Sequence, residues 1–473
     1  MKKKFDIAIV GAGVIGASIA RELSAYRLKV ILFEKEEELA FGVSKSNSGI
    51  IHPGLQNRPG TLKGRLCLEG NSLIRKISRD LGVDFKEVGE LMVIFNKEEL
   101  GRLMKIKENA QKLGVKGVRL VDRAWLKKNE PNLNSKVFKA LYAPSAGIIS
   151  PYRLVYDLSE NAIRNGVIIK TSCPVKNIVK NKNLFQIVTS KGRFQAKYII
   201  NSAGLYADDI AGMLGIRDFN IRPRKGEEFI LDKKKQYLTN HLIFPLPSEM
   251  SKGIIVIKTA DGNPMIGPTA EDVQDKKDLS TTDEGFQKVL ASARRLVPSI
   301  KGEDIIAYFA GLRPVAGDDF IIRLERKAAN CITVAGMQSP GLTASLAVAL
   351  MVKKILKETG LDLKRKKVFV KHRKKTIHLF SLKESQIKKL IKKDPDYGDI
   401  VCRCENVSAK EIKDAIDRGA TTLDGIKFRT RAQAGRCHGG FCTTRILKML
   451  ASHTGRPVER ITKKGPGSEI IKG

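Results

Sequence analysis

The sequence has few aromatic residues and lacks an apolar segment long enough to cross a bilayer. Aromatic residues make up 6% of the 473 residues, and there is one Trp. The chain therefore offers no evident platform for stacking nucleic-acid bases, and no recognition module is visible. The longest apolar run, residues 342–352, is shorter than a membrane-spanning helix requires. We predict neither nucleic-acid binding nor a transmembrane segment.

Acidic residues are scarce beside basic ones: 50 Asp and Glu against 86 Lys and Arg give a net charge of +36. Basic clusters occur at residues 233–235, 364–367 and 371–375. Such clusters can bind nucleic acid or an anionic membrane, but the lysines are spread over the whole chain. We interpret most of this charge as a solvated surface. An anionic substrate, an acidic partner and peripheral association with a membrane remain open.

Internal repeats and low-complexity tracts are also absent, and the chain is too long for one compact core. The first residues are basic and precede an apolar stretch, as in a secretory signal, but Asp6 interrupts that stretch. Glycines at the spacing of a nucleotide-binding turn follow it directly. We therefore interpret the segment as part of the fold and expect a cytoplasmic protein.

The strongest local pattern lies at the start of the chain. An apolar stretch at residues 5–10 is followed by Gly-Ala-Gly-Val-Ile-Gly at residues 11–16 and by helical periodicity to about residue 25. A second apolar stretch, residues 29–33, ends in Glu34. This order predicts a strand, a glycine turn, a helix and a second strand of a doubly wound parallel sheet.

Each glycine of such a turn has a physical role in binding a dinucleotide. Gly11 permits the tight turn, Gly13 lets the backbone approach the pyrophosphate, and Gly16 lets helix and strand pack closely. The helix N-terminus stabilises the diphosphate charge, and Glu34 is placed to bind the adenosine ribose. The sequence therefore predicts one dinucleotide site, and no second fingerprint of this kind occurs.

Cysteine is the other residue with an uneven distribution. Three of the seven are isolated and are expected in the core: Cys67, Cys173 and Cys331. Four form two close pairs near the end of the chain: Cys402, Cys404, Cys437 and Cys442. Thiolates select zinc or iron–sulfur clusters, but the Cys-x-Cys pair does not match a zinc knuckle and the spacing differs from plant-type ferredoxins. An iron–sulfur module beside one dinucleotide site favours a flavin over NAD, because flavins release single electrons.

Between these two regions the periodicity gives coarse predictions. Residues 89–95 alternate as a strand and residues 97–113 have helical periodicity. Residues 176–188 and 194–200 are expected as two antiparallel strands joined by the turn at residues 190–192.

The motifs together resemble those of the D-amino-acid oxidase-like flavoprotein superfamily. Besides the glycine turn, the segments 44–54, 202–204, 311–314 and 339–343 occur in the order of that superfamily. The likeness covers about residues 1–360 and is greatest to the branch of glycerol-3-phosphate dehydrogenases and oxidases and L-2-hydroxyglutarate oxidases. It implies that FAD is bound and that further residues contact it: Lys35, Ser46, Ser48, Val175, Gly204, Gly336, Ser339, Gly341, Leu342 and Thr343.

The C-terminal segment, about residues 399–450, is similar to the bacterioferritin-associated-ferredoxin-like domain. The resemblance implies that Cys402, Cys404, Cys437 and Cys442 hold a [2Fe-2S] cluster. Four cysteines complete such a cluster, so His438 is expected in the surrounding loop and not as a ligand.

These patterns predict an α/β protein in which a split Rossmann-like FAD-binding domain carries an inserted, mixed α+β substrate domain. The FAD-binding parts are expected at about residues 1–88, 145–222 and 326–360, the substrate parts at about 89–144 and 223–325, a basic linker at 361–395, the [2Fe-2S] module at 396–452 and a C-terminal tail at 453–473.

Oxidising a secondary alcohol needs a base for the hydroxyl proton and cations to hold an anionic substrate. The resemblance gives the role of base to His52 and places Arg313 and Lys258 at the substrate. The remaining histidines outside the module, His241, His372, His378 and His453, lie in no motif and are expected at the surface. Residues 338–341 replace the Gly-Gly-Lys turn of the large membrane-bound glycerol-phosphate dehydrogenases, which argues for the smaller enzymes of this branch.

Three functions follow from the resemblance. The first is oxidation of sn-glycerol 3-phosphate to dihydroxyacetone phosphate, with electrons passing through the cluster to a partner protein or a quinone. The second is oxidation of an L-2-hydroxy acid such as 2-hydroxyglutarate. The third is an electron-transfer subunit without a substrate of its own. Fold-level analogy alone does not decide between them.

Overall fold

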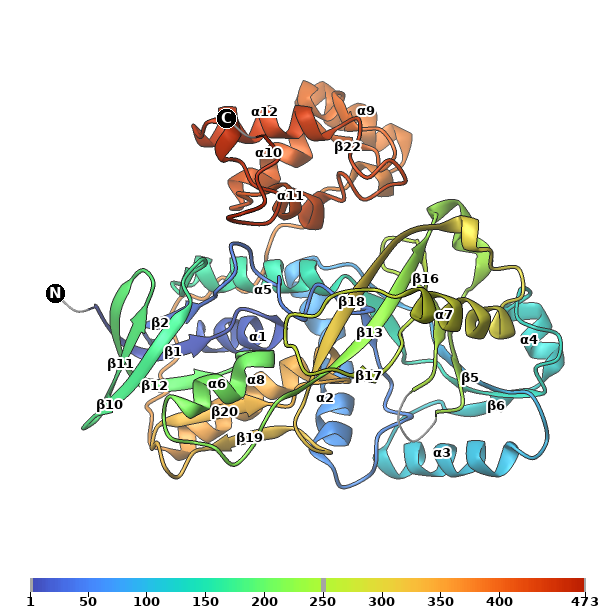
Figure 1. Cartoon of the computed structure of the whole chain (residues 1–473), viewed down its shortest axis with the longest axis horizontal. Coiled ribbons are helices and arrows are strands. Elements are labelled where there is room, and N and C mark those ends of the chain that lie inside the picture. Colours follow the sequence, from blue (N-terminus) through green and yellow to red (C-terminus); the bar gives the residue numbers. More distant parts are fainter. Residues whose placement is uncertain (1–2, 248–251, 472–473) are drawn as a thin grey trace.

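Two large sheets lie side by side, and a small helical module covers one edge of both (Figure 1). This arrangement is seen in a computed structural model that describes residues 3–247 and 252–471. Each sheet has its own buried apolar cluster, and the module has a third. The division agrees with the split α/β architecture expected from the sequence.

The first sheet has eight strands and contains the predicted glycine turn. Its parallel part has the order β9 (Ile168–Lys170), β2 (Val30–Phe33), β1 (Lys3–Val10), β12 (Gly192–Asn201) and β20 (Cys331–Ala335). Antiparallel strands extend it: β10 (Val175–Asn181), β11 (Leu184–Thr189) and β19 (Ile321–Leu324). Strands β2 and β20 are buried along their whole length, as expected of parallel strands with both faces covered.

Helices cover this sheet and bring distant segments together. Helix α1 (Val14–Leu23) packs against α5 (Pro151–Arg164) and α8 (Gly341–Glu358), and α2 (Leu62–Leu81) packs against α8. Helix α8 follows the carboxyl end of β20, which is parallel to β12 and β1. Its N-terminus therefore lies at the same edge of the sheet as the glycine turn. That edge carries the carboxyl ends of the parallel strands, where ligands bind in open α/β sheets.

The second sheet has nine strands, and the helix α7 (Asp283–Leu296) packs on it. Its strands follow the order β17 (Glu271–Asp272), β13 (Arg222–Leu231), β16 (Pro264–Gly267), β15 (Ile255–Lys258), β14 (Leu242–Pro245), β5 (Glu90–Ile94), β7 (Lys139–Ala143) and β6 (Arg119–Val121), with β18 (Ile305–Val315) also paired to β13. Two further helices belong to this part: α3 (Leu100–Leu113) and α4 (Arg123–Asn129). A three-stranded sheet joins the two bodies: β3 (Ile50–Ile51), β8 (Gly147–Ile149) and β4 (Phe85–Glu87).

The C-terminal module is built around three short helices and a two-stranded sheet. The elements are β21 (Ile400–Cys402), β22 (Val407–Ser408), α10 (Ala409–Asp417), α11 (Leu423–Thr430) and α12 (Thr443–Thr454). Ser408 caps α10 in a capping box with Glu411, and Thr422 caps α11. The tail expected after residue 452 belongs in part to this module, because Ile461 is buried in its core and the Leu423 amide donates to the Thr462 carbonyl.

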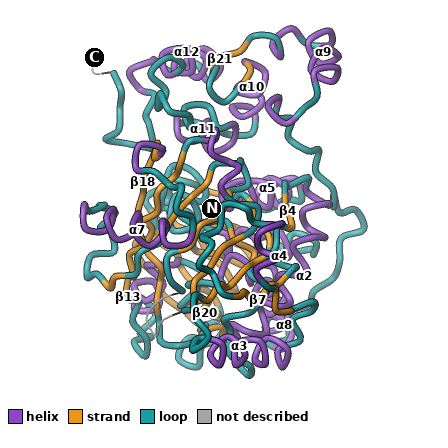
Figure 2. The backbone as a smooth tube through the Cα atoms, turned by 90° about the vertical axis from the view of Figure 1, so that its right-hand side faces the viewer, coloured by secondary structure: helices purple, strands orange, loops and turns teal. Residues whose placement is uncertain are grey.

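The basic segment after α8 is attached to the first body along its length. The amide of Arg27 donates to the Lys364 carbonyl, Lys366 donates to Ala25, and Arg373 donates to Asp80. From there the chain runs along one side of the molecule to the module (Figure 2). It then forms α9 (Glu384–Lys393). The expected linker at 361–395 is therefore an attached segment, residues 361–383, followed by a helix. We call residues 361–383 the strap.

Two other details differ from the sequence-based expectations. Residues 176–188 are a hairpin and not one strand, because Lys182 adopts a left-handed turn conformation between β10 and β11. Strand β19 pairs in the dinucleotide sheet, so the second body ends before residue 321 and not at 325. Among the described residues, no helix combines the length and apolarity needed to cross a membrane.

Candidate functional site

A cavity of about 860 Å³ runs from the glycine turn to the second sheet and the C-terminal module. We refer to it as the dinucleotide cavity. Of the residues expected to contact the cofactor, those that line it are Gly11, Gly13, Glu34, Lys35, Ser46, Ser48, Val175, Gly204, Gly341 and Leu342. Segments separated by more than three hundred residues therefore converge on one space, as the motif order implied.

The glycine turn has the geometry that a pyrophosphate requires. Gly11 has a φ of +98°, and a Cβ built on it would lie 2.5 Å from the Ser202 carbonyl oxygen. A Cβ on Gly16 would lie 1.9 Å from the Gly11 carbonyl oxygen. Side chains are thus excluded at both positions, and the backbone is left open at the N-terminus of α1.

Glu34 lies at the end of β2, where the ribose of a dinucleotide is expected. Its carboxylate is buried and accepts a hydrogen bond of 2.7 Å from the Ala12 amide. Burial raises the pKa of this group, although the backbone hydrogen bonds oppose that effect. The residues present therefore fit an adenine dinucleotide such as FAD.

Four of the expected cofactor residues lie outside the lining of this cavity: Gly16, Gly336, Ser339 and Thr343. Gly16 acts in packing, as described above. Gly336 has a φ of +67° and turns the chain between β20 and α8. Ser339 and Thr343 contact His52 instead.

His52 follows β3 directly and is fixed from three directions. Its amide donates to Thr343 Oγ1 at 2.9 Å, and its carbonyl accepts from Asn71 Nδ2 at 2.9 Å. The ring atom Nε2 lies 3.2 Å from Ser339 Oγ. Helices α2 and α8 thus hold the backbone of the expected base, and the loop before α8 contacts its ring.

Two charged residues that the sequence reasoning missed surround the imidazole of His52. Lys252 Nζ donates to Ser339 Oγ at 3.0 Å, and Glu90 Oε2 lies 4.0 Å from His52 Nδ1. Burial and the Lys252 charge together lower the pKa of His52 well below its ordinary value. The ring is therefore neutral at pH 7 and able to accept a proton.

Glu90 is buried and Lys252 is partly buried, and the two influence one another. Burial raises the pKa of Glu90 to about 7, and the Lys252 ammonium opposes this effect. Burial lowers the pKa of Lys252; the Glu90 carboxylate acts against that shift and the Arg313 guanidinium adds to it. Lys252 is thus the cation within electrostatic reach of both His52 and Arg313.

Arg313 lies on β18 with its guanidinium mostly buried and donates to the Thr269 carbonyl at 3.2 Å. The neighbouring Glu228 accepts a hydrogen bond from Ser48, and burial raises the pKa of Glu228 to about 7. A planar guanidinium in this position suits two-point binding of a phosphate or carboxylate. The substrate-binding role expected for Arg313 stays a prediction.

Lys258 has different neighbours from those expected. It lies at the end of β15, where the charges acting on its pKa, after burial, are those of Glu130 and Lys86. The lysine at His52 is Lys252, which precedes this strand in a Lys-Gly turn. Sequence reasoning favoured the strand end and passed over the turn before it.

Two of the histidines expected at the surface are not exposed. His378 is 4% exposed and its Nδ1 lies 3.7 Å from Glu411 Oε1, while His241 Nδ1 lies 2.7 Å from Glu130 Oε2. His372 and His453 are exposed, as expected. The expectation was wrong for these two residues because acidic partners in remote segments allow His378 to be buried and His241 to be partly buried.

The three isolated cysteines, Cys67, Cys173 and Cys331, are buried as expected.

The four clustered cysteines converge at one end of the module. Cys404 Sγ lies 3.5 Å from Cys437 Sγ, and the Cys402 and Cys442 thiols share a hydrogen bond. Burial raises the pKa of Cys437, but bonds from the Gly439 and Phe441 amides and from Cys404 outweigh it and lower that pKa.

This donor set fits a two-iron cluster. Such a cluster divides four thiolates between two irons. Within residues 3–247 and 252–471, no three His, Cys, Asp or Glu side chains are arranged as ligands of one metal ion. Soft thiolates and amide donors directed at sulfur are the environment that iron–sulfur clusters use.

A buried arginine joins the module to the second body. Arg431 donates to Glu405 at 2.8 Å within the module, and to Asp261 at 2.9 Å and Asn263 at 2.8 Å beyond it. Asp261 also binds Arg153, and these two guanidiniums hold its pKa well below the ordinary value despite burial. The contact is therefore a buried ionic network and not a surface pair.

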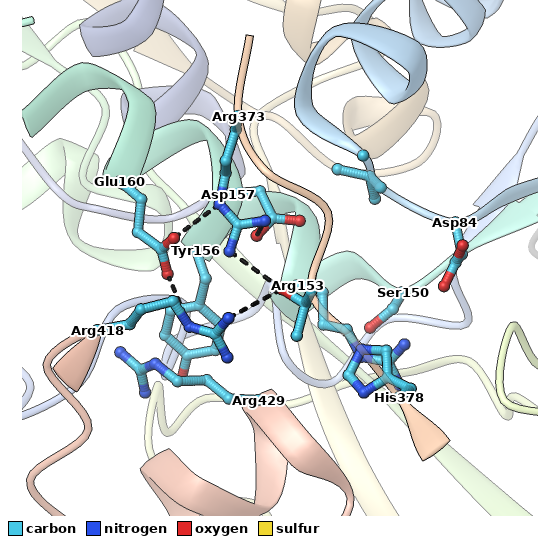
Figure 3. Close-up of a pocket in the computed structure, with 13 residues that line it drawn as sticks. Asp84, Ser150, Arg153, Tyr156, Asp157, Glu160, Arg373, His378, Arg418 and Arg429 are labelled. Carbon is cyan, nitrogen blue, oxygen red and sulfur yellow. Dashed lines mark hydrogen bonds and ion pairs between the residues drawn. The ribbon is translucent and has the colours of Figure 1, made fainter. Parts of the chain in front are cut away.

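A second arginine-rich contact joins the module, the strap and helix α5 (Figure 3). The Arg429 guanidinium lies 3.8 Å from the centroid of the Tyr156 ring and donates to Glu38 at 2.8 Å. Arg373 of the strap and Arg418 of the module both approach Glu160. Between them remains a cavity of about 20 Å³, room for a single water molecule.

These contacts place the module over the open end of the dinucleotide cavity. Its residues Lys427, Phe428, Arg431, Ala434 and His438 form part of the cavity lining. His438 follows Cys437 directly, so one cluster ligand lies next to a residue that borders the cavity. The four clustered cysteines therefore lie close to the dinucleotide cavity, and His438 is a loop residue of its lining.

Comparisons with known proteins agree with this geometry. The family model "FAD dependent oxidoreductase" matches residues 6–355, and "BFD-like [2Fe-2S] binding domain" matches residues 400–452. Glycerol 3-phosphate dehydrogenase of Caloramator mitchellensis is 42% identical over 99% of this chain and 98% of its own length. Mitochondrial L-2-hydroxyglutarate dehydrogenase of Caenorhabditis elegans is 29% identical over 74% of this chain and 92% of its own.

A solved structure extends the likeness to three dimensions. L-alpha-glycerophosphate oxidase from Mycoplasma pneumoniae, with FAD bound, superimposes with a TM-score of 0.76 and 30% identity. The match covers 79% of this chain and 100% of that one. The cofactors are accordingly FAD and a [2Fe-2S] cluster. The chain belongs to the family of FAD-dependent oxidoreductases and carries a C-terminal BFD-like [2Fe-2S] binding domain.

Proposed function

We propose that the protein oxidises sn-glycerol 3-phosphate to dihydroxyacetone phosphate and passes the electrons through its [2Fe-2S] cluster to an acceptor outside the chain. The observation that carries this proposal is the likeness to a glycerol 3-phosphate dehydrogenase along almost the whole of both chains. That match spans 99% of this chain and therefore includes the cluster module.

The residues around His52 support the reaction chemically. A neutral imidazole held at its backbone by Thr343 and Asn71 can take the proton of the substrate hydroxyl. Lys252 and Arg313 supply positive charge for the phosphate. Ser339, bonded to Lys252 and in contact with His52, orients the two groups relative to each other.

FAD, when bound, supplies the acceptor for the substrate hydride and can release electrons singly. The chain's own contribution is to hold the substrate and its proton acceptor beside that cofactor. The module's place over the dinucleotide cavity supports transfer to the cluster without a large movement.

A second candidate is the oxidation of an L-2-hydroxy acid. It is favoured by the likeness to an L-2-hydroxyglutarate dehydrogenase over most of both chains. In that case Arg313 would bind a carboxylate in two-point fashion. The same base and the same redox centres would serve.

Anaerobic titration separates the two candidates. Glycerol 3-phosphate is expected to bleach the flavin absorption of the purified holoprotein, with L-2-hydroxyglutarate added in a parallel cell. Bleaching by the hydroxy acid alone would replace the first proposal by the second. Bleaching by neither would leave a role in electron transfer only.

A further inference from the structure

The loops that carry the four clustered cysteines contain residues that border the dinucleotide cavity and residues that are exposed to solvent. On one side, Ala434 and His438 border the dinucleotide cavity. On the other side, Cys404 is exposed and Phe441 is 91% exposed. This is the largest exposed fraction of any large apolar side chain among the described residues. A cluster held by these cysteines would therefore be accessible from the surface on the side of Cys404.

The exposed charges on this outer side all have the same sign. In residues 402–406 and 435–445 the exposed charged side chains are Arg403, Arg436 and Arg445. The acidic residue of these loops, Glu405, is buried and bonded to Arg431.

These three arginines differ in how far they are neutralised. Arg436 pairs with Asp232 and Arg445 with Asp399, whereas Arg403 forms no ion pair with any residue that the structure describes. Arg403 lies between two cluster ligands, Cys402 and Cys404. A positive charge with no ion-pair partner in the described part of the chain thus lies between two of the residues that would hold the cluster.

We propose that this surface, formed by Arg403, Cys404, Arg436, Phe441 and Arg445, is the docking site for an acidic protein that carries electrons one at a time. We call it the exit surface. The proposal deepens the proposed function, because it rests on electrons leaving through the cluster. Aromatic residues and arginines are the residue types enriched at protein interfaces, and opposite charges accelerate encounter of the partners.

The electron balance requires two encounters for each turnover. Oxidation of one secondary alcohol to a ketone releases two electrons and two protons. Two molecules of the oxidised carrier each take one electron, and the protons pass to solvent. A small, charged and short-lived contact suits such repeated exchange, and electron-transfer complexes bury less than about 1,200 Å².

A membrane quinone fits this surface less well. The apolar part of the exit surface is the single phenyl ring of Phe441, and the other exposed residues of that surface include three arginines. A quinone must leave the lipid and reach the cluster edge through an apolar contact. One ring gives little apolar area for insertion into lipid, whereas it is enough to anchor a small protein contact.

The test uses electron delivery from the reduced holoprotein, independent of substrate. The protein is reduced photochemically without oxygen, freed of excess reductant and mixed with oxidised cytochrome b5, an acidic one-electron carrier, or with cytochrome c, a basic one. We expect fast reduction of cytochrome b5 that slows as salt is raised, and slower reduction of cytochrome c. Arg403→Glu and Phe441→Ala should each raise the cytochrome b5 concentration for half-maximal rate about tenfold.

A matched charge reversal at an exposed residue of α3, Lys105→Glu, controls for net charge and should leave that concentration unchanged. Iron and flavin contents identify variants that have lost a centre. The proposal is overturned if Arg403→Glu and Phe441→Ala deliver electrons to cytochrome b5 like the parent at every salt concentration. It is also overturned if quinone-containing vesicles accept electrons rapidly and cytochrome b5 does not. Because no substrate is added, neither result depends on glycerol 3-phosphate being oxidised.

Discussion

At the scale of single residues, burial determines the chemistry of the site. His52 is a useful base because its desolvated ring, next to Lys252, resists protonation at neutral pH. Replacing it with an amide of similar size removes the proton acceptor and retains the packing. We expect His52→Gln to lower the rate of flavin reduction by substrate about 10²- to 10⁴-fold. Stopped-flow absorbance measures this rate; an unchanged rate in a variant with full flavin content would remove His52 from the mechanism.

The same electrostatics predict how activity depends on pH. A group with a lowered pKa is protonated only when the pH falls below its ordinary value, so kcat/KM should decline on the acid side at a pH below about 6.5. Lys252→Met removes the charge that lowers the pKa of His52, and the decline should then begin at higher pH. It should also weaken substrate binding through the lost charge.

Lys258→Met is the matched control for that experiment, since Lys258 lies near Glu130 and Lys86 and not at His52. Its pH profile should coincide with that of the parent. If Lys258→Met moves the acid limb and Lys252→Met does not, the assignment of the substrate lysine reverts to the one expected from the sequence.

At the scale of elements, the turn between β1 and α1 depends on the absence of side chains. A methyl group on Gly16 meets the Gly11 carbonyl at 1.9 Å, so strand and helix must move apart. We expect Gly16→Ala to lower the FAD content of the purified protein and to destabilise it by about 1–3 kcal/mol. Flavin absorbance per chain and urea unfolding measure the two effects.

Gly101→Ala provides the comparison, because a Cβ at this exposed position of α3 meets nothing within 4 Å. That change should leave FAD content unaltered and stabilise the protein by about 0.5–1 kcal/mol. Equal FAD content in Gly16→Ala and Gly101→Ala would show that the close approach at Gly16 is dispensable.

How much the sequence could predict differs from element to element. The first strand, glycine turn and helix were predictable because local spacing and burial agree there. The four cysteines were equally clear. The hairpin at Lys182 was missed because a left-handed lysine gives no compositional signal. Lys252 was missed because its role depends on Glu90 and Ser339, which only the fold brings near.

At the scale of the whole molecule, the position of the module is the feature that the sequence did not reveal. The strap looked like a basic linker, yet Arg373 pairs with Asp157 and Glu160 on α5. The arginines of the module seemed to be surface charge, yet Arg429 and Arg431 are buried against acidic partners in the two bodies. Part of the net charge of +36 therefore serves to dock the module.

The last prediction concerns that docking. Arg431→Gln leaves the carboxylates of Asp261 and Glu405 buried without the guanidinium that joins them. Breaking such a pair by removing one partner costs about 3–5 kcal/mol, because a buried charge is left uncompensated. The module should then separate from the dinucleotide cavity more readily. Flavin reduction by substrate should keep the parent rate while reduction of the cluster, followed by its electron paramagnetic resonance signal, becomes slower.

Arg323→Gln is the control, because its pairs with Asp218 and Glu325 lie in the first body, away from the module, and the Arg323 side chain is exposed. The exposed pair with Asp218 contributes about 0–1 kcal/mol. Because the buried partner Glu325 also lies away from the module, both rates should match the parent. The two rates therefore separate docking from chemistry. Slower flavin reduction in Arg431→Gln would indicate damage at the flavin, and unchanged rates of flavin and cluster reduction would mean that the module needs no ionic contact at Arg431 to receive electrons. Only slower cluster reduction with unchanged flavin reduction supports a module held in place by its buried arginine.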